Sequence, residues 1–259
     1  MVSTLTIIGL CFTVLCSLFL PIGAWIFLVK KGKNMSRYIL LGMFGFFIAQ
    51  IILRTPILMI LGSEQWFADF ANAYPIFYAL FLSLLTALFE TASRYIIYKY
   101  AIKEDIVFST ALGTGFGHGA CETLAYVGIT SVVNLSVAIM INTNNLAKSE
   151  SYEAMKETLV SVSASNYFAA GAERLIVMLI HIGLSVILAY FIQKNMSLTG
   201  FGVCMTVHCI YDFTVKLISQ LNVSVWITII AMAIFAVMIT AFTVYVKKQE
   251  KEPLLQIKK

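Results

Sequence analysis

The chain has 259 residues, of which 60% are hydrophobic and 12% are charged, and its formal net charge is +5. A soluble domain usually contains about 45–50% apolar and about 25% charged residues, so this composition excludes an ordinary soluble enzyme and favours a multi-pass protein of the cell membrane. The basic excess calls for no nucleic acid as a partner, because basic residues beside membrane spans are attracted to anionic membrane lipid.

Seven apolar stretches are long enough to cross a bilayer, if about 20 residues make one crossing. We therefore expect an all-α bundle of about seven transmembrane helices that forms a single integral membrane domain over residues 1–259. The fourth stretch is too long for one straight crossing, so we expect it to tilt, break or continue along the membrane surface. The predicted spans lie near 4–29, 38–61, 75–98, 106–141, 167–192, 198–218 and 222–246.

The loops between these spans alternate in charge, which predicts the orientation of the chain. Basic residues gather after the first, third, fifth and seventh spans, whereas the other loops are acidic or mixed. Basic loops usually stay in the cytoplasm. We therefore expect the amino terminus outside and the carboxyl terminus in the cytoplasm.

Charged and histidine side chains inside four of the spans are the main indication of function. A charge at the bilayer centre costs about 2.5–3.5 kcal/mol on insertion scales, so such residues are expected to face a protein interior or a water-filled cavity. Helical spacing places the two members of each pair on one helix face. The pairs are Glu90 with Arg94, His118 with Glu122, Arg174 with His181, and His208 with Asp212.

The three histidines of the chain are predicted to lie at one depth. A rise of about 1.5 Å per residue places His118, His181 and His208 close to the bilayer centre. A lone membrane histidine more often hydrogen-bonds to a neighbouring helix, but three at one depth, each with a charged neighbour, favour one polar chamber. We expect the carboxylates Glu90, Glu122 and Asp212 to lie in the same chamber.

Other residues have simpler explanations. Glu173, Arg54 and Lys216 lie near the predicted outer ends of their spans, where solvation costs little and long basic side chains reach the interface. Glycines at alternate positions around His118 form two overlapping GxxxG patterns, which allow close approach of helices. The same glycines would also leave room beside His118 for water or a substrate strand. The glycines are Gly113, Gly115, Gly117 and Gly119.

The clustered groups suit peptide hydrolysis, which needs an activated water, a donor for the oxyanion and an acid for the leaving amine. Glu90 is the candidate general base, and Arg94 one turn away would hold it in position. Zinc is the alternative, held by His118, His181 and His208 with a carboxylate, because two or three imidazoles and a carboxylate make a reasonable zinc site. The chain lacks an HExxH motif, so the sequence permits the metal without indicating it.

Four motifs stand in order along the third to the sixth span. They are Glu90-Thr-Ala-Ser-Arg94, Gly115-Phe-Gly-His118-Gly-Ala-Cys-Glu122, Glu173-Arg174 followed by His181, and His208-Cys-Ile-Tyr-Asp212. This set resembles the motifs of the YhfC family of bacterial intramembrane proteases. That family is similar to the type II CAAX prenyl proteases, to PrsW and to the Aph subunit of γ-secretase.

The resemblance implies an intramembrane protease of the bacterial plasma membrane that acts on a membrane-associated peptide or protein. The first-motif glutamate of the relatives activates water, and here it corresponds to Glu90, with Phe89 where a second glutamate is usual. The relatives are assigned to both glutamic and metal-dependent classes, and we favour the glutamic route. We expect His118 and His208 to complete the water and oxyanion site, oriented by Glu122, His181 and Asp212.

Two other classes of function compete with this interpretation. A non-catalytic membrane scaffold, comparable to the Aph subunit, would use the same polar groups to hold an assembly together. A proton-coupled transporter would use the histidines as a relay. Glu90 beside two histidines favours the enzyme over the scaffold, and the lack of an obvious inverted repeat weakens the case for the transporter.

Overall fold

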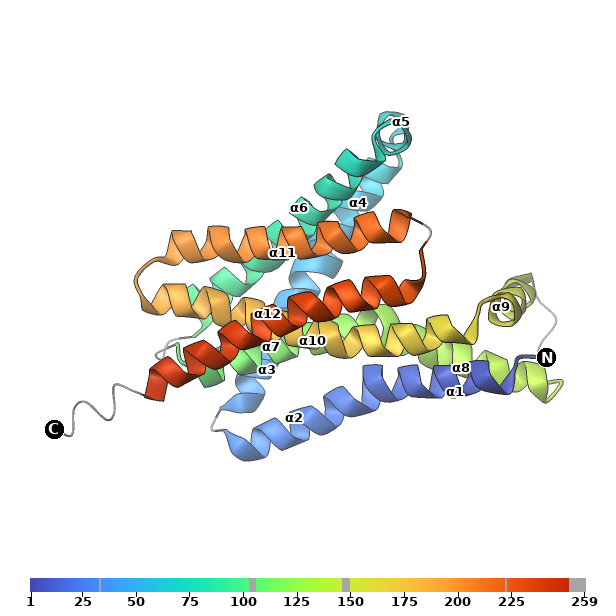
Figure 1. Ribbon diagram of the computed structural model, residues 1–259, viewed down its shortest axis with the longest axis horizontal. Coiled ribbons are helices and arrows are strands. Elements are labelled where there is room, and N and C mark those ends of the chain that lie inside the picture. Colours follow the sequence, from blue (N-terminus) through green and yellow to red (C-terminus); the bar gives the residue numbers. More distant parts are fainter. Residues whose placement is uncertain (33, 103–105, 146–149, 222, 252–259) are drawn as a thin grey trace.

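The computed structural model describes all residues of the chain except 33, 103–105, 146–149, 222 and 252–259. The described residues form α-helices and π-helical turns joined by short loops (Figure 1). Within this described part, seven helices are long and apolar enough to cross a membrane. The prediction of an all-α, multi-pass bundle is therefore confirmed, and the helices begin and end close to the predicted limits.

Each of the first four spans combines α-helical segments with one π-helical turn. The first two spans are α1 (Thr4–Val14), η1 (Leu15–Phe19) and α2 (Leu20–Lys31), then α3 (Met35–Phe46), η2 (Phe47–Arg54) and α4 (Thr55–Gly62). The next two are α6 (Pro75–Ile96) and η3 (Ile97–Ala101), then α7 (Phe108–Thr123), η4 (Leu124–Gly128) and α8 (Ile129–Asn142). The last three spans are α10 (Ala164–Gln193), α11 (Ser197–Gln220) and α12 (Val225–Lys251), and the short helices α5 (Gln65–Ala73) and α9 (Glu150–Ser161) lie in loops.

Two of the π-helical turns stand directly before a proline near the start of the next α-helix. Pro21 follows η1, and Pro56 follows η2. Because proline has no backbone N–H, it removes one helical hydrogen bond and disturbs the regular ladder at that point. Such π-helical turns occur frequently at functional sites, and η2 carries two side chains of the site described below.

The fourth span is one continuous helix rather than a broken one. It runs over 35 residues from Phe108 to Asn142, which corresponds to about 52 Å against a hydrocarbon thickness of about 30 Å. At its end, the Asn142 Oδ1 atom accepts a hydrogen bond from the Val2 backbone N–H at 2.8 Å, and Nδ2 donates to the Val2 carbonyl at 2.9 Å. The end of α8 is therefore tied to the start of the chain.

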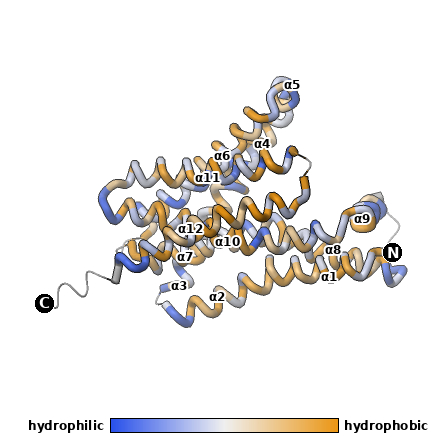
Figure 2. The backbone as a smooth tube through the Cα atoms, in the orientation of Figure 1, coloured by the Kyte–Doolittle hydropathy of each residue, from blue (hydrophilic) through white to orange (hydrophobic). Residues whose placement is uncertain are grey.

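Helix α10 lies at the centre of the bundle and contacts α1, α7, α11 and α12 (Figure 1). The largest apolar core cluster includes the fully buried Ile180, Leu184 and Leu188 of this helix. Apolar residues extend along the spans and hydrophilic residues gather at several of the connections (Figure 2). Many large apolar side chains, such as Phe44 and Val237, are exposed, as expected for helices that face lipid.

Helix α7 packs closely between α3 and α10 because its glycines point alternately to both. A Cβ atom added at Gly117 would lie 2.0 Å from the Ile39 carbonyl oxygen of α3, and one added at Gly115 would lie 2.6 Å from the Ile182 Cα of α10. The space beside these glycines is filled by the backbones of neighbouring helices. The glycines therefore serve helix packing and do not provide room for a substrate strand.

Candidate active site

Four helices carry the site residues expected from the sequence, and the structure brings the central five together in the bundle interior. Glu90, Arg94, His118, His181 and His208 are each no more than 2% exposed. The residues lie on α6 (Glu90 and Arg94), α7 (His118 and Glu122), α10 (Arg174 and His181) and α11 (His208 and Asp212).

Glu90 lies at the centre of the cluster. Its Oε2 atom is 2.8 Å from His118 Nε2, 3.7 Å from His181 Nδ1 and 3.8 Å from His208 Nε2. One carboxylate oxygen is therefore within 4 Å of all three histidines of the chain, at hydrogen-bond distance from one of them.

Arg94 connects Glu90 to His181. Its Nη2 atom lies 3.3 Å from Glu90 Oε2 and 2.6 Å from His181 Nδ1. Because a guanidinium only donates hydrogen bonds, Nδ1 accepts in this contact. A neutral His181 ring consequently carries its proton on Nε2, on the side of Glu122.

Glu122 completes the cluster on the far side of His181. Its Oε2 atom lies 2.6 Å from His181 Nε2, and its Oε1 atom lies 3.6 Å from Arg174 Nη1. The short contact with His181 lacks hydrogen-bond geometry, so Oε2 is buried without a hydrogen bond. Arg174 also forms a short ion pair with its neighbour Glu173.

The second span contributes Gln50 and Arg54, neither of which was expected in the site. Gln50 is 1% exposed, and its Nε2 atom donates a hydrogen bond of 2.8 Å to Glu90 Oε1. Its own Oε1 atom accepts from Arg54 Nη1 at 3.1 Å. A buried amide inside an apolar stretch needs a hydrogen-bond partner, so the sequence marks Gln50 as a residue with a polar partner without indicating that the partner is Glu90.

A cavity of about 250 Å³ lies beside this cluster, and many charged side chains line it. Solvated positions at helix ends were expected for Glu173, Arg54 and Lys216, but the structure places all three in the cavity wall. Glu173 and Lys216 keep 34% and 30% of their side chains exposed, so partial solvation holds, but hydropathy did not indicate that these side chains also face the cavity. The charged lining residues are Arg54, Glu90, Glu122, Glu173, Arg174, Asp212 and Lys216.

Asp212 and His208 share one face of α11 but are only loosely joined. His208 Nε2 lies 3.9 Å from Asp212 Oδ1, whereas Lys216 Nζ donates a hydrogen bond of 3.2 Å to Asp212 Oδ2. The Nδ1 atom of His208 is buried without a hydrogen bond. His118 and His181 each form a direct hydrogen bond, at 2.8 Å and 2.6 Å, whereas the Nε2 contacts of His208 are 3.8 Å and 3.9 Å long, so the His208 ring is less constrained.

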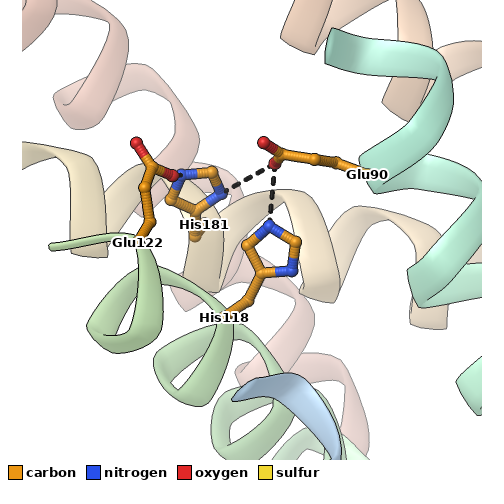
Figure 3. A group of neighbouring side chains, drawn as sticks. All are labelled: Glu90, His118, Glu122 and His181. Atoms are coloured by element: carbon orange, nitrogen blue, oxygen red, sulfur yellow. Dashed lines mark hydrogen bonds and ion pairs between the residues drawn. The ribbon is translucent and has the colours of Figure 1, made fainter. Parts of the chain in front are cut away.

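Four residues of the cluster form a group that could hold a metal ion. Glu90, His118, Glu122 and His181 each offer a donor atom, and these atoms lie within 4.8 Å of one another (Figure 3). Imidazole nitrogen and carboxylate oxygen are ligands that zinc accepts, and the buried Glu122 Oε2 atom has no hydrogen bond. The donor set therefore fits zinc, whereas His208, expected as a third histidine ligand, lies outside this group.

Comparisons with known proteins indicate the family and its broad class. The family model described as YhfC intramembrane metalloprotease matches residues 16–249. A relative described as uncharacterized membrane protein YhfC, from Bacillus subtilis (strain 168), is 22% identical over 205 residues, which cover 76% of this chain and 80% of the relative. No solved structure matches the chain.

The family match bears on location and on broad class. A multi-pass membrane protein with seven apolar helices and a metalloprotease family match is consistent with zinc as a possible cofactor. The preference for a glutamic route finds no support in the family description, which names a metalloprotease. The similarity to prenyl proteases, PrsW and the Aph subunit stays a prediction. Since the family model covers most of the residues, the chain belongs to the YhfC family of intramembrane metalloproteases.

Proposed function

We propose that this chain hydrolyses a peptide bond of a membrane-associated peptide or protein in the cavity beside Glu90. The observation that carries the proposal is that Glu90 Oε2 lies within 4 Å of all three histidines. A buried carboxylate among imidazoles inside a membrane bundle is costly, and such groups usually mark a functional site. The whole chain, residues 1–259, acts as one membrane domain, with the motif helices at about 75–218 as its catalytic core.

Glu90 accepts the proton of the attacking water. Gln50 holds the Oε1 atom of its carboxylate through a hydrogen bond of 2.8 Å, and Arg94 contacts the Oε2 atom at 3.3 Å. These contacts fix the carboxylate so that Oε2 faces the histidines. A base held in one orientation needs little reorganisation when the proton is transferred.

His208 acts on the substrate rather than on the attacking water. Its Nε2 atom is 3.8 Å from Glu90 Oε2 and 3.9 Å from Asp212 Oδ1, so neither contact is a direct hydrogen bond. An imidazole N–H in this position is free to donate a hydrogen bond to the oxyanion, and the proton that Glu90 takes from the water passes on to the leaving amine. Asp212 orients the His208 ring from one turn farther along α11.

Three side chains are proposed to hold zinc: His118, His181 and Glu122. Catalytic zinc sites keep three protein ligands and one open position, whereas four protein ligands usually make a closed structural site. Glu90 therefore stays available as the base. Zinc held by these side chains would supply positive charge that polarises the substrate carbonyl. Binding through His181 Nε2 requires the ring proton to reside on Nδ1, which the contact with Arg94 opposes.

The proposal is tested by comparing the membrane proteomes of cells that carry wild-type protein, Glu90→Gln or Glu153→Gln. Glutamine preserves the shape of the side chain, and Glu153 is an exposed glutamate paired with Lys156 at 3.0 Å. Fragments of a membrane protein should accumulate with wild type and Glu153→Gln and disappear with Glu90→Gln. Identical fragments in all three membranes would contradict the proposal and favour a scaffold.

The cofactor is tested on the detergent-purified protein once a fragment has identified a substrate. Zinc is expected at near one ion per chain, and a chelator should abolish hydrolysis, which added zinc should restore. His118→Ala should lose both zinc and activity. Full activity in the presence of a chelator, without bound zinc, would instead indicate the glutamic route.

A further inference from the structure

Four carboxylates line the cavity and three basic side chains form ion pairs with them, because Glu122 and Glu173 share Arg174. Glu122 lies 3.6 Å from a guanidinium nitrogen, and Asp212 lies 3.2 Å from an ammonium nitrogen. Each carboxylate therefore has a basic side chain in direct contact, although Glu122 and Glu173 divide one positive charge between them. The pairs are Glu90 with Arg94, Glu122 and Glu173 with Arg174, and Asp212 with Lys216.

Arg54 differs from the other basic side chains of the cavity. In the part of the chain that the structure describes, no carboxylate forms an ion pair with it, and its Nη1 atom donates to the neutral Gln50 amide at 3.1 Å. Its Nε atom is buried without a hydrogen bond. Arg94 and Arg174 also have buried N–H groups without a hydrogen bond, so the difference lies in the missing ion pair. A guanidinium that lines a membrane cavity without a carboxylate in direct contact is costly, and an incoming anion would relieve that cost.

We propose that Arg54 binds a carboxylate of the peptide substrate, and this inference rests on the proposed function of the Glu90 site. A guanidinium presents parallel N–H donors that match the two oxygens of a carboxylate. The carboxylate is supplied by the peptide, either at its carboxyl terminus or on an Asp or Glu side chain. Peptides without such a group would leave Arg54 unpaired and would be disfavoured.

The hydrogen bonds through Gln50 also limit where the carboxylate stands relative to the bond that is hydrolysed. Arg54 Nη1 contacts one end of the Gln50 amide at 3.1 Å, and Glu90 Oε1 contacts the other end at 2.8 Å. The guanidinium is therefore at most about 8 Å from the base, and an extended peptide spans about 3.3–3.6 Å per residue. With about 3 Å more for the contact at each end, the recognised carboxylate lies within about four residues of the hydrolysed bond.

The test offers detergent-purified, full-length protein three pools of degenerate apolar peptides. One pool ends in a free carboxylate, the second is amidated, and the third is amidated but contains one Asp. Mass spectrometry counts retained peptides and released products separately. Wild type is compared with the test variants Arg54→Gln and Arg54→Lys and with two controls. Lys216→Gln removes a cavity cation that is already paired with Asp212. Lys156→Gln removes an exposed cation.

Wild type should retain at least one acidic pool about tenfold more than the amidated pool, as a charged hydrogen bond permits. The preference should vanish in Arg54→Gln. It should weaken in Arg54→Lys, which keeps the charge but lacks the parallel N–H donors of a guanidinium. It should persist in the controls Lys216→Gln and Lys156→Gln. The pool that is retained identifies the source of the carboxylate. If Arg54→Gln does not purify as a folded protein, the weakened preference of Arg54→Lys carries the test.

Three results would overturn the inference. The first is equal retention of the acidic and amidated pools by wild type, and the second is a preference that survives in both Arg54 variants or disappears equally in Lys216→Gln. The third is that the purified protein binds phosphatidylglycerol in preference to phosphatidylcholine, in a way that depends on Arg54, and shows no preference among the peptides. The bound anion would then be a lipid. Retention without products in any pool would contradict the proposed hydrolysis and leave the role of Arg54 supported.

Discussion

The substitution Gly117→Ala tests the close packing that positions His118. The added Cβ atom would lie 2.0 Å from the Ile39 carbonyl oxygen and 2.7 Å from its carbonyl carbon. Both atoms belong to the backbone, so neither can rotate away as a flexible side chain would. Helix α3 would have to move away from α7 by roughly 1.4 Å to restore an ordinary contact, because well-packed interiors hold little free space.

Such overpacking usually destabilises a protein by about 1–3 kcal/mol. For a chain of this length that corresponds to a decrease of roughly 2–10 °C in the unfolding temperature. Because α3 continues into η2, its movement also displaces Gln50, which holds Glu90, and it separates the wall of the site from His118. Hydrolysis should therefore decrease in the fraction of protein that stays folded.

The matched control is Gly202→Ala, in which an added Cβ atom meets no heavy atom within 4 Å. Alanine is favoured over glycine in helices by up to about 1 kcal/mol, so this variant should unfold at the same or a slightly higher temperature than wild type. The measurement is thermal unfolding of detergent-purified protein followed by tryptophan fluorescence. Equal unfolding temperatures for Gly117→Ala and Gly202→Ala would refute the close approach of α3 and α7.

Three further predictions concern the site and the orientation. Gln50→Leu removes a hydrogen bond to the buried Glu90 carboxylate, so stability should fall by about 1.5–3 kcal/mol in chemical unfolding, whereas the exposed Gln65→Leu should not change it. Arg94→Gln removes a positive charge beside the proposed ligands, so zinc affinity measured against a competing chelator should rise at least about tenfold; weaker binding would contradict the proposed competition. A reporter fused to the carboxyl terminus should be cytoplasmic and one in the 142–166 loop external, and the reverse would contradict the predicted orientation.

The sequence was sufficient for the number of spans and for the pairing of polar residues on helix faces. Length and apolarity decide whether a segment crosses a bilayer, and both are properties of the segment itself. The four-residue spacing of His118 and Glu122 placed both on one face of a helix, and the structure has both beside His181. These inferences need only helix geometry, which every α-helix shares.

The roles of Gln50 and Arg54 could not be obtained in this way. Gln50 is uncharged and its span contains no histidine, so nothing in the local pattern linked it to Glu90 forty residues later. The path of the fourth span was also left open, because its apolar length is compatible with a tilted helix, a broken helix or a surface segment. The structure shows one helix with a π-helical turn at η4.

By itself, the sequence determined that this protein is a seven-span α-helical membrane protein with charged and histidine side chains in its spans, because insertion into lipid depends on residues that are near in the chain. Only the tertiary structure decided that one oxygen of Glu90 faces all three histidines. It also decided that Glu122 rather than His208 joins the group that could hold a metal ion, and that Arg54 lines the cavity. These facts depend on how each helix is rotated about its axis, and that rotation is set by contacts such as those of Gly117 with α3, which residues distant in the chain create together.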